Sequence, residues 1–109
     1  MVSYFVRYRG SAADPSAFTS YYAEKHAAIL KRFPGLRSLI LHMPAAWNDP
    51  FPVNPGGSLL LTQMVFDNPQ ALDAALRSEA RTEARADFSR FPQFQGEVTH
   101  EAMTARPIV

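Results

Sequence analysis

Alternation of apolar and polar residues predicts four β-strands along the chain. Residues 2–9 alternate, and one side of that strand carries Val2, Tyr4, Val6 and Tyr8. Residues 36–43 and 96–104 also read as strands with a two-residue period. Residues 58–67 are apolar on both sides, as expected of a strand buried on two faces.

A complete helix is predicted between the first two strands. Asp14 supplies an N-cap, and Pro15 takes the first helical position, where its missing N–H costs nothing. At about 100° per residue, one narrow arc collects four large apolar side chains: Phe18, Tyr22, Ile29 and Phe33. His26 lies just beyond the edge of that arc, and Pro34-Gly35 stops the helix. We therefore expect a helix to about residue 33 with His26 on its buried side.

A second helical region follows Asp67-Asn68-Pro69, which repeats the cap-then-proline pattern. It continues to Phe91, and we expect it to break once. From Ser78 onward it is rich in alanine and charge, and five side chains are interpreted as a solvated face: Arg77, Glu79, Arg81, Glu83 and Arg85.

The resulting order, β-α-β-β-α-β, predicts an α+β fold of the ferredoxin-like kind over residues 1–109 as one domain. Both helices then cover one face of a four-stranded antiparallel sheet. We expect the other face to expose part of the third strand, together with Phe5 or several of Val2, Tyr4, Val6 and Tyr8. An apolar face of that size needs a cover, so we expect a homodimer in which two sheets meet face to face.

Composition and charge narrow the function. The net charge is +1 and the basic residues are scattered, so we expect no nucleic-acid partner and no membrane partner. The chain has no cysteine, which excludes a disulfide framework, a thiolate nucleophile and a cysteine-based metal site. The first residues alternate and carry two arginines, unlike a signal peptide, and we expect a cytoplasmic protein.

The predicted first helix carries a recognisable pattern, Phe18-x-x-Tyr21-Tyr22-x-x-x-His26, followed by Phe33-Pro34-Gly35-Leu36. This pattern resembles the EthD family, within the dimeric α+β barrel superfamily, and the resemblance covers nearly the whole chain in order and length. It implies two ferredoxin-like protomers paired sheet to sheet, with a pocket between sheet and helices in each. Relatives include proteins of ether-degradation operons, muconolactone-type isomerases, and small cofactor-free cyclases and monooxygenases.

His26 is the first candidate for chemistry. The resemblance implies that it faces the pocket as a general base or acid, and an imidazole suits proton transfer near neutral pH. Tyr22 is the second catalytic candidate, because it lies on the buried arc one turn from His26 and its hydroxyl needs a partner. The alternative is a structural histidine hydrogen-bonded at the edge of the core.

Other residues are expected to bind substrate. The set comprises Tyr8, His42, Trp47, Phe51, Met64 and His100. Trp47 and Phe51 lie on the proline-rich loop of residues 44–57, where they either cover an apolar ligand or bury against a dimer partner. Tyr8 and Met64 otherwise belong to the core. A zinc site built from the three histidines is geometrically possible, but no local metal motif is present, and we expect neither metal nor cofactor.

Two functions remain open at this point. The first is a small cofactor-independent enzyme of catabolism or secondary metabolism, of isomerase, cyclase or monooxygenase type. It would act on an apolar carbonyl- or lactone-bearing small molecule through proton transfer by His26. The alternative is a non-catalytic small-molecule-binding accessory protein of a degradation operon. A haem-degrading protein is a third hypothesis.

Overall fold

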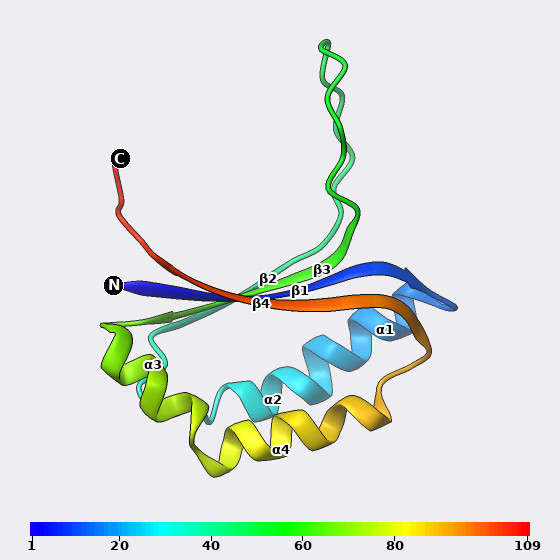
Figure 1. Cartoon of the computed structure of the whole chain (residues 1–109). Helices are drawn as coiled ribbons and strands as arrows, with labels where there is room; N and C mark the ends of the chain where they lie inside the picture. Colours follow the sequence, from blue (N-terminus) through cyan, green and yellow to red (C-terminus); the bar gives the residue numbers. More distant parts are fainter.

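The computed structural model describes all 109 residues and shows a four-stranded antiparallel sheet in the order β2-β3-β1-β4. The strands are β1 (Val2–Ala12), β2 (Ser38–His42), β3 (Ser58–Phe66) and β4 (Phe94–Thr104). All helices lie against one face of this sheet (Figure 1). The ferredoxin-like α+β prediction is therefore confirmed.

The helices form two arms of the same layer. The first arm is α1 (Pro15–Tyr21), a π-helical turn η1 (Tyr22–His26) and α2 (Ala27–Leu30). The second is α3 (Pro69–Leu76), α4 (Glu79–Asp87) and a 3₁₀ turn η2 (Phe88–Arg90). The first arm ends three residues earlier than the predicted Phe33, and the expected break in the second falls between α3 and α4. No helix has the length and apolar character needed to cross a bilayer.

Side-chain caps explain where the helices begin. Asp14 accepts a hydrogen bond from the Ala17 backbone N–H at 3.0 Å at the start of α1. Asn68 caps α3 in the same way, through the Ala71 N–H at 2.8 Å. Ser78 caps α4, which accounts for the break before it. These caps set the two helical arms at fixed positions along the sheet.

The two faces of the sheet differ from the sequence-based expectation. Val2, Tyr4 and Tyr8 are buried under the helices rather than exposed on the open face. The expectation was correct for Phe5, which pairs with Gln63 on the uncovered face. The large apolar residues of that face are Phe5, Ile40, Leu59, Leu61, Val65 and Met103. The pairing register decides which side chains face the helices, because a shift of one residue would exchange the two faces of a strand.

Residues 43–57 form a long arm between β2 and β3, which we call the β2–β3 arm. It projects from the sheet on the side opposite the helices (Figure 1). Two large side chains of the arm are mostly exposed, Trp47 at 64% and Phe51 at 74%. The arm therefore extends from the uncovered side of the sheet.

Two glycines allow the ends of β1 and β4 to approach closely. Gly10 pairs with Gly96, and their φ angles are 145° and 150°, values that side-chain-bearing residues rarely adopt. A Cβ on Gly10 would collide with the Gln95 carbonyl oxygen, and one on Gly96 with the Arg9 carbonyl oxygen. Glycine is required at both positions to keep this end of the sheet closed.

Candidate functional site

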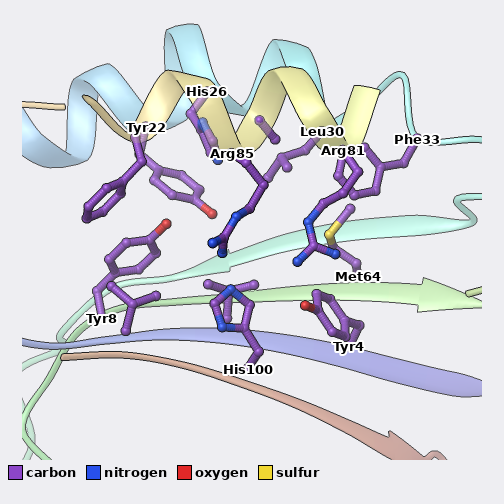
Figure 2. Close-up of a pocket in the computed structure, with 14 residues that line it drawn as sticks. Tyr4, Tyr8, Tyr22, His26, Leu30, Phe33, Met64, Arg81, Arg85 and His100 are labelled. Carbon is purple, nitrogen blue, oxygen red and sulfur yellow. The ribbon is translucent and has the colours of Figure 1, made fainter. Parts of the chain in front are cut away.

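A cavity of about 270 Å³ lies between the sheet and the helices (Figure 2). Fourteen residues line it, and ten of them are hydrophobic, so the space suits a largely apolar ligand. The lining comprises Tyr4, Val6, Tyr8, Tyr22, His26, Leu30, Phe33, Met64, Arg81, Ala84, Arg85, Phe88, Val98 and His100. Its volume lies just below the usual range of ligand pockets, about 300–1,000 Å³, so it suits a small ligand.

His26 is held in the helical wall of this cavity by a buried carboxylate. Its Nδ1 lies 2.9 Å from Oδ2 of Asp87, the last residue of α4, and both side chains are about 5% exposed. The other carboxylate oxygen accepts a hydrogen bond from the Tyr21 hydroxyl at 2.7 Å. A carboxylate beside Nδ1 fixes the ring proton on that nitrogen.

The second nitrogen of His26, Nε2, is left for the cavity. It makes no hydrogen bond to the protein, yet no fully buried polar side-chain atom lacks a partner. Nε2 therefore keeps access to the open volume that His26 lines. The π-helical turn η1 supports this placement, since the Ala27 N–H bonds to the Tyr22 carbonyl and both Tyr22 and His26 are buried on the sheet side. Such turns occur often at functional sites.

The electrostatics favour a neutral His26 beside a charged Asp87. Burial lowers the pKa of His26 below its ordinary value, and the hydrogen bond and charge of Asp87 oppose this only in part. Burial would raise the pKa of Asp87, but hydrogen bonds from His26 and Tyr21 outweigh it and hold that pKa below the usual range. At neutral pH the pair is an imidazole with a free Nε2 lone pair, oriented by a carboxylate.

The hydroxyl of Tyr22 has a different partner from the one expected. It accepts a hydrogen bond from the Thr62 hydroxyl at 2.6 Å, whereas its ring, and not its oxygen, contacts His26, with centroids 4.8 Å apart. Burial raises the pKa of Tyr22 to about 12, so the group stays protonated. The Tyr8 hydroxyl points toward that of Tyr22 (Figure 2), and burial also raises the pKa of Tyr8.

Two charged side chains, Arg81 and Arg85, also line the cavity. Arg81 and Arg85 reach down from α4 toward His100 on β4 (Figure 2). Burial and the two guanidinium charges lower the pKa of His100. The solvated face predicted for α4 holds for Arg85, which is exposed, whereas Arg81 is half-buried; both side chains also line the cavity.

The structure brings together five of the eight site residues predicted from sequence: Tyr8, Tyr22, His26, Met64 and His100. It does not bring in His42, which lies on the uncovered face of the sheet and bonds to Gln63 at 3.2 Å. Trp47 and Phe51 are on the β2–β3 arm, away from the cavity, so the expectation that they cover its ligand is corrected. Their burial against a dimer partner stays a prediction.

A three-histidine metal site is not formed, because His42 faces away from His26 and His100. No group of three or more histidine, cysteine, aspartate or glutamate side chains is placed to hold a metal ion. The cavity itself offers apolar walls, tyrosine hydroxyls, two guanidiniums and one carboxylate-oriented imidazole. This set can bind a small molecule and move a proton.

Known proteins share the family pattern and the fold of this chain. The EthD domain model matches residues 11–95. An EthD family protein from Bacillus halodurans C-125 has 21% identity and a TM-score of 0.76, with 97% of this chain and 99% of that chain covered. SnoaB, a cofactor-independent oxygenase from Streptomyces nogalater, has 20% identity and a TM-score of 0.62, with 99% and 95% covered.

A dimeric ferredoxin-like protein of unknown function from Thermobifida fusca YX has 8% identity and a TM-score of 0.67, with 95% of this chain and 90% of that chain covered. At these identities the likeness shows the fold. No curated protein matches the chain. The family model covers most of the chain, as the helix pattern around His26 indicated. This protein belongs to the EthD family.

Proposed function

We propose that this protein is a small cofactor-independent enzyme in which His26 removes a proton from carbon in an apolar, carbonyl-bearing substrate. One observation carries the proposal: a buried imidazole is held at Nδ1 by Asp87 at 2.9 Å while Nε2 opens onto an apolar cavity. A neutral imidazole with a lowered pKa is a competent base near neutral pH.

The residues around His26 suit the step. As Nε2 takes the proton, the ring becomes charged, and the Asp87 carboxylate stabilises that charge. The substrate carbonyl oxygen gains negative charge at the same time, and the protonated Tyr22 hydroxyl can donate to it. The enolate then accepts a proton at another carbon, attacks a carbonyl within the same molecule, or reacts with O₂. These outcomes correspond to isomerisation, cyclisation and oxygenation.

The oxygenase outcome is supported by SnoaB, whose description names it a cofactor-independent oxygenase. A different observation favours a non-catalytic ligand-binding accessory protein: the Tyr22 hydroxyl is engaged by Thr62, and no hydrogen bond joins it to His26. In that case the same cavity would hold a small molecule without changing it. Proton exchange at carbon separates the two functions.

We also propose a homodimer formed through the uncovered sheet face. Phe5, Leu59 and Leu61 of this face are only partly covered within one chain. The β2–β3 arm rises on the same side and carries exposed Trp47 and Phe51, which a second copy would cover. The dimeric ferredoxin-like protein from Thermobifida fusca supports this arrangement.

The experiment follows loss of α-protons in D₂O by ¹H NMR for a panel of aryl methyl ketones, lactones and 1,3-diketones. We expect the protein to accelerate exchange of at least one compound class. We expect His26→Gln to slow it by about 10²–10⁴-fold, the usual contribution of a general base. His42→Gln is the matched control, because it changes the same side chain on the opposite face of the sheet. Binding without exchange would support the accessory function instead, and full exchange in His26→Gln would refute His26 as the base.

A further inference from the structure

The two arginines that line the cavity have no carboxylate partner within the chain. Arg81 and Arg85 are one helical turn apart on α4, and neither guanidinium makes a side-chain hydrogen bond or ion pair. By contrast, Arg32, which follows α2, donates to Glu83 on α4 at 2.6 Å, and Arg37 binds Asp67 through two hydrogen bonds. Other arginines without a partner lie outside the cavity, so Arg81 and Arg85 are the two free guanidiniums that line it.

An apolar cavity is a costly place for two like charges. Positive groups four residues apart on a helix repel each other, and Arg81 is also half-buried, which removes it partly from water. His100 cannot supply a counter-charge, because an imidazole is either neutral or positive; burial and both arginines lower its pKa. The one carboxylate in the helical wall, Asp87, is already bound by His26 and Tyr21. The protein supplies no counter-charge here.

We propose, as an inference that rests on the proposed function, that the substrate is a small apolar carboxylic acid bound as its anion by Arg81 and Arg85. Planar guanidiniums match a carboxylate through paired N–H donors, which suits them to this role more than a lysine would. The remaining lining, including Leu30, Phe33 and Met64, would hold the apolar body.

This placement also orients the reaction. Figure 2 shows Arg81 and Arg85 reaching toward His100 and the sheet, while His26 lies higher in the helical wall near Tyr22. A carboxylate held by the arginines would therefore keep the reacting carbon at a distance from the anion and direct it toward His26. The arginines position the substrate, and His26 remains the base.

The test uses 2-naphthoate and 2-naphthamide, which share a flat apolar body and differ in the charge of one end. Isothermal titration calorimetry gives the affinities of both probes at low ionic strength for the wild type, Arg81→Gln, Arg85→Gln and the double variant. Arg77→Gln is the matched control, because it removes an exposed arginine at the end of α3 that does not line the cavity. Unchanged binding of 2-naphthamide shows that each variant is folded.

We expect the wild type to bind the acid about 10-fold to 100-fold more tightly than the amide, as charge-assisted hydrogen bonds predict. Each single variant should lose part of this preference and the double variant all of it, while Arg77→Gln keeps it. Equal affinities in the wild type, no binding of the acid, or an equal loss in Arg77→Gln would overturn the proposal.

The result is separable from that for His26. If the arginines bind carboxylates but His26 is no base, His26→Gln and the wild type share the preference for the acid and neither catalyses exchange. If His26 is the base but the arginines bind no carboxylate, neutral ketones still exchange and the preference for the acid is absent.

Discussion

Asp87→Asn removes one charge from the candidate site and keeps its shape. Asp87 is 4% exposed and receives hydrogen bonds from His26 at 2.9 Å and Tyr21 at 2.7 Å. Hydrogen bonds to a charged group contribute about 1.5–3 kcal/mol, and neutral ones about 0.5–1.5 kcal/mol. Loss of the charge should therefore lower the free energy of unfolding by about 1 kcal/mol per bond, or about 2 kcal/mol in all.

The effect on proton transfer should be larger than the effect on stability. The new amide can donate its NH₂ to Nδ1 of His26, which moves the ring proton to Nε2 and removes the base from the cavity. We expect α-proton exchange to slow by about 10²–10⁴-fold. Asp87 raises the pKa of His26 against the larger opposing effect of burial, so its loss lowers that pKa further. The residual activity should persist to lower pH than in the wild type.

The assay measures the exchange rate from about pH 4.5 to 8, a range that spans the ordinary histidine pKa of about 6.5. Circular dichroism with urea gives the free energy of unfolding of the same samples. A variant that is destabilised by about 2 kcal/mol but keeps the wild-type rate and the wild-type acidic limb would refute the role of Asp87, because a purely structural carboxylate predicts that pattern.

Stability should depend on pH through the same pair. The folded pKa of His26 is lowered, so between that value and about 6.5 the unfolded chain binds more protons than the folded one. Wild-type stability should therefore fall as the pH drops below about 6.5. Asp87, whose pKa is also lowered, adds a second loss below about pH 4. His26→Gln should remove the first loss and reduce the second, because the hydrogen bond from His26 is one of those that lower the pKa of Asp87.

Three further variants test neighbouring parts of the structure. Tyr21→Phe removes a hydrogen-bond donor from Asp87, so the carboxylate should raise the pKa of His26 more strongly. The exchange rate should then begin to fall at a higher pH than in the wild type as the solution is acidified. Gly10→Ala should lower the free energy of unfolding by about 2 kcal/mol or more in urea, because a Cβ there collides with the neighbouring strand. Trp47→Ser combined with Phe51→Ser should weaken the proposed dimer in sedimentation equilibrium; an unchanged association constant would exclude the arm from the interface.

Local signals explain why much of the fold could be predicted. Asp14-Pro15 and Asn68-Pro69 mark helix starts through side-chain caps and a fixed φ angle, both of which act within four residues. The strand boundaries depend on longer-range pairing, and the observed starts of β2 and β4 each differ by two residues from the predicted starts. The face of β1 could not be assigned, because both of its sides carry aromatic residues and only packing against the helices decides.

The candidate site depended even more on long-range contacts. His26 could be placed in the cavity wall because its helix has a strong apolar arc. Asp87 is 61 positions away on a helix whose buried side consists of small Ala80 and Ala84, so no large apolar pattern marked that side. For the same reason, no pattern on α4 indicated that Arg85 lines the cavity. An aspartate in line with two alanines, at a spacing of three or four residues, is the one sequence signal that could have identified this face.

The ring nitrogens of His26 can be observed directly by ¹⁵N NMR, with His26→Gln used to assign the signals. A base oriented by Asp87 predicts that at about pH 7 Nδ1 carries the proton, Nε2 carries none, and the pKa of His26 is below about 6.5. A proton on Nε2 in the neutral ring, or a pKa above about 6.5, would contradict the assignment of His26 as the general base of the cavity.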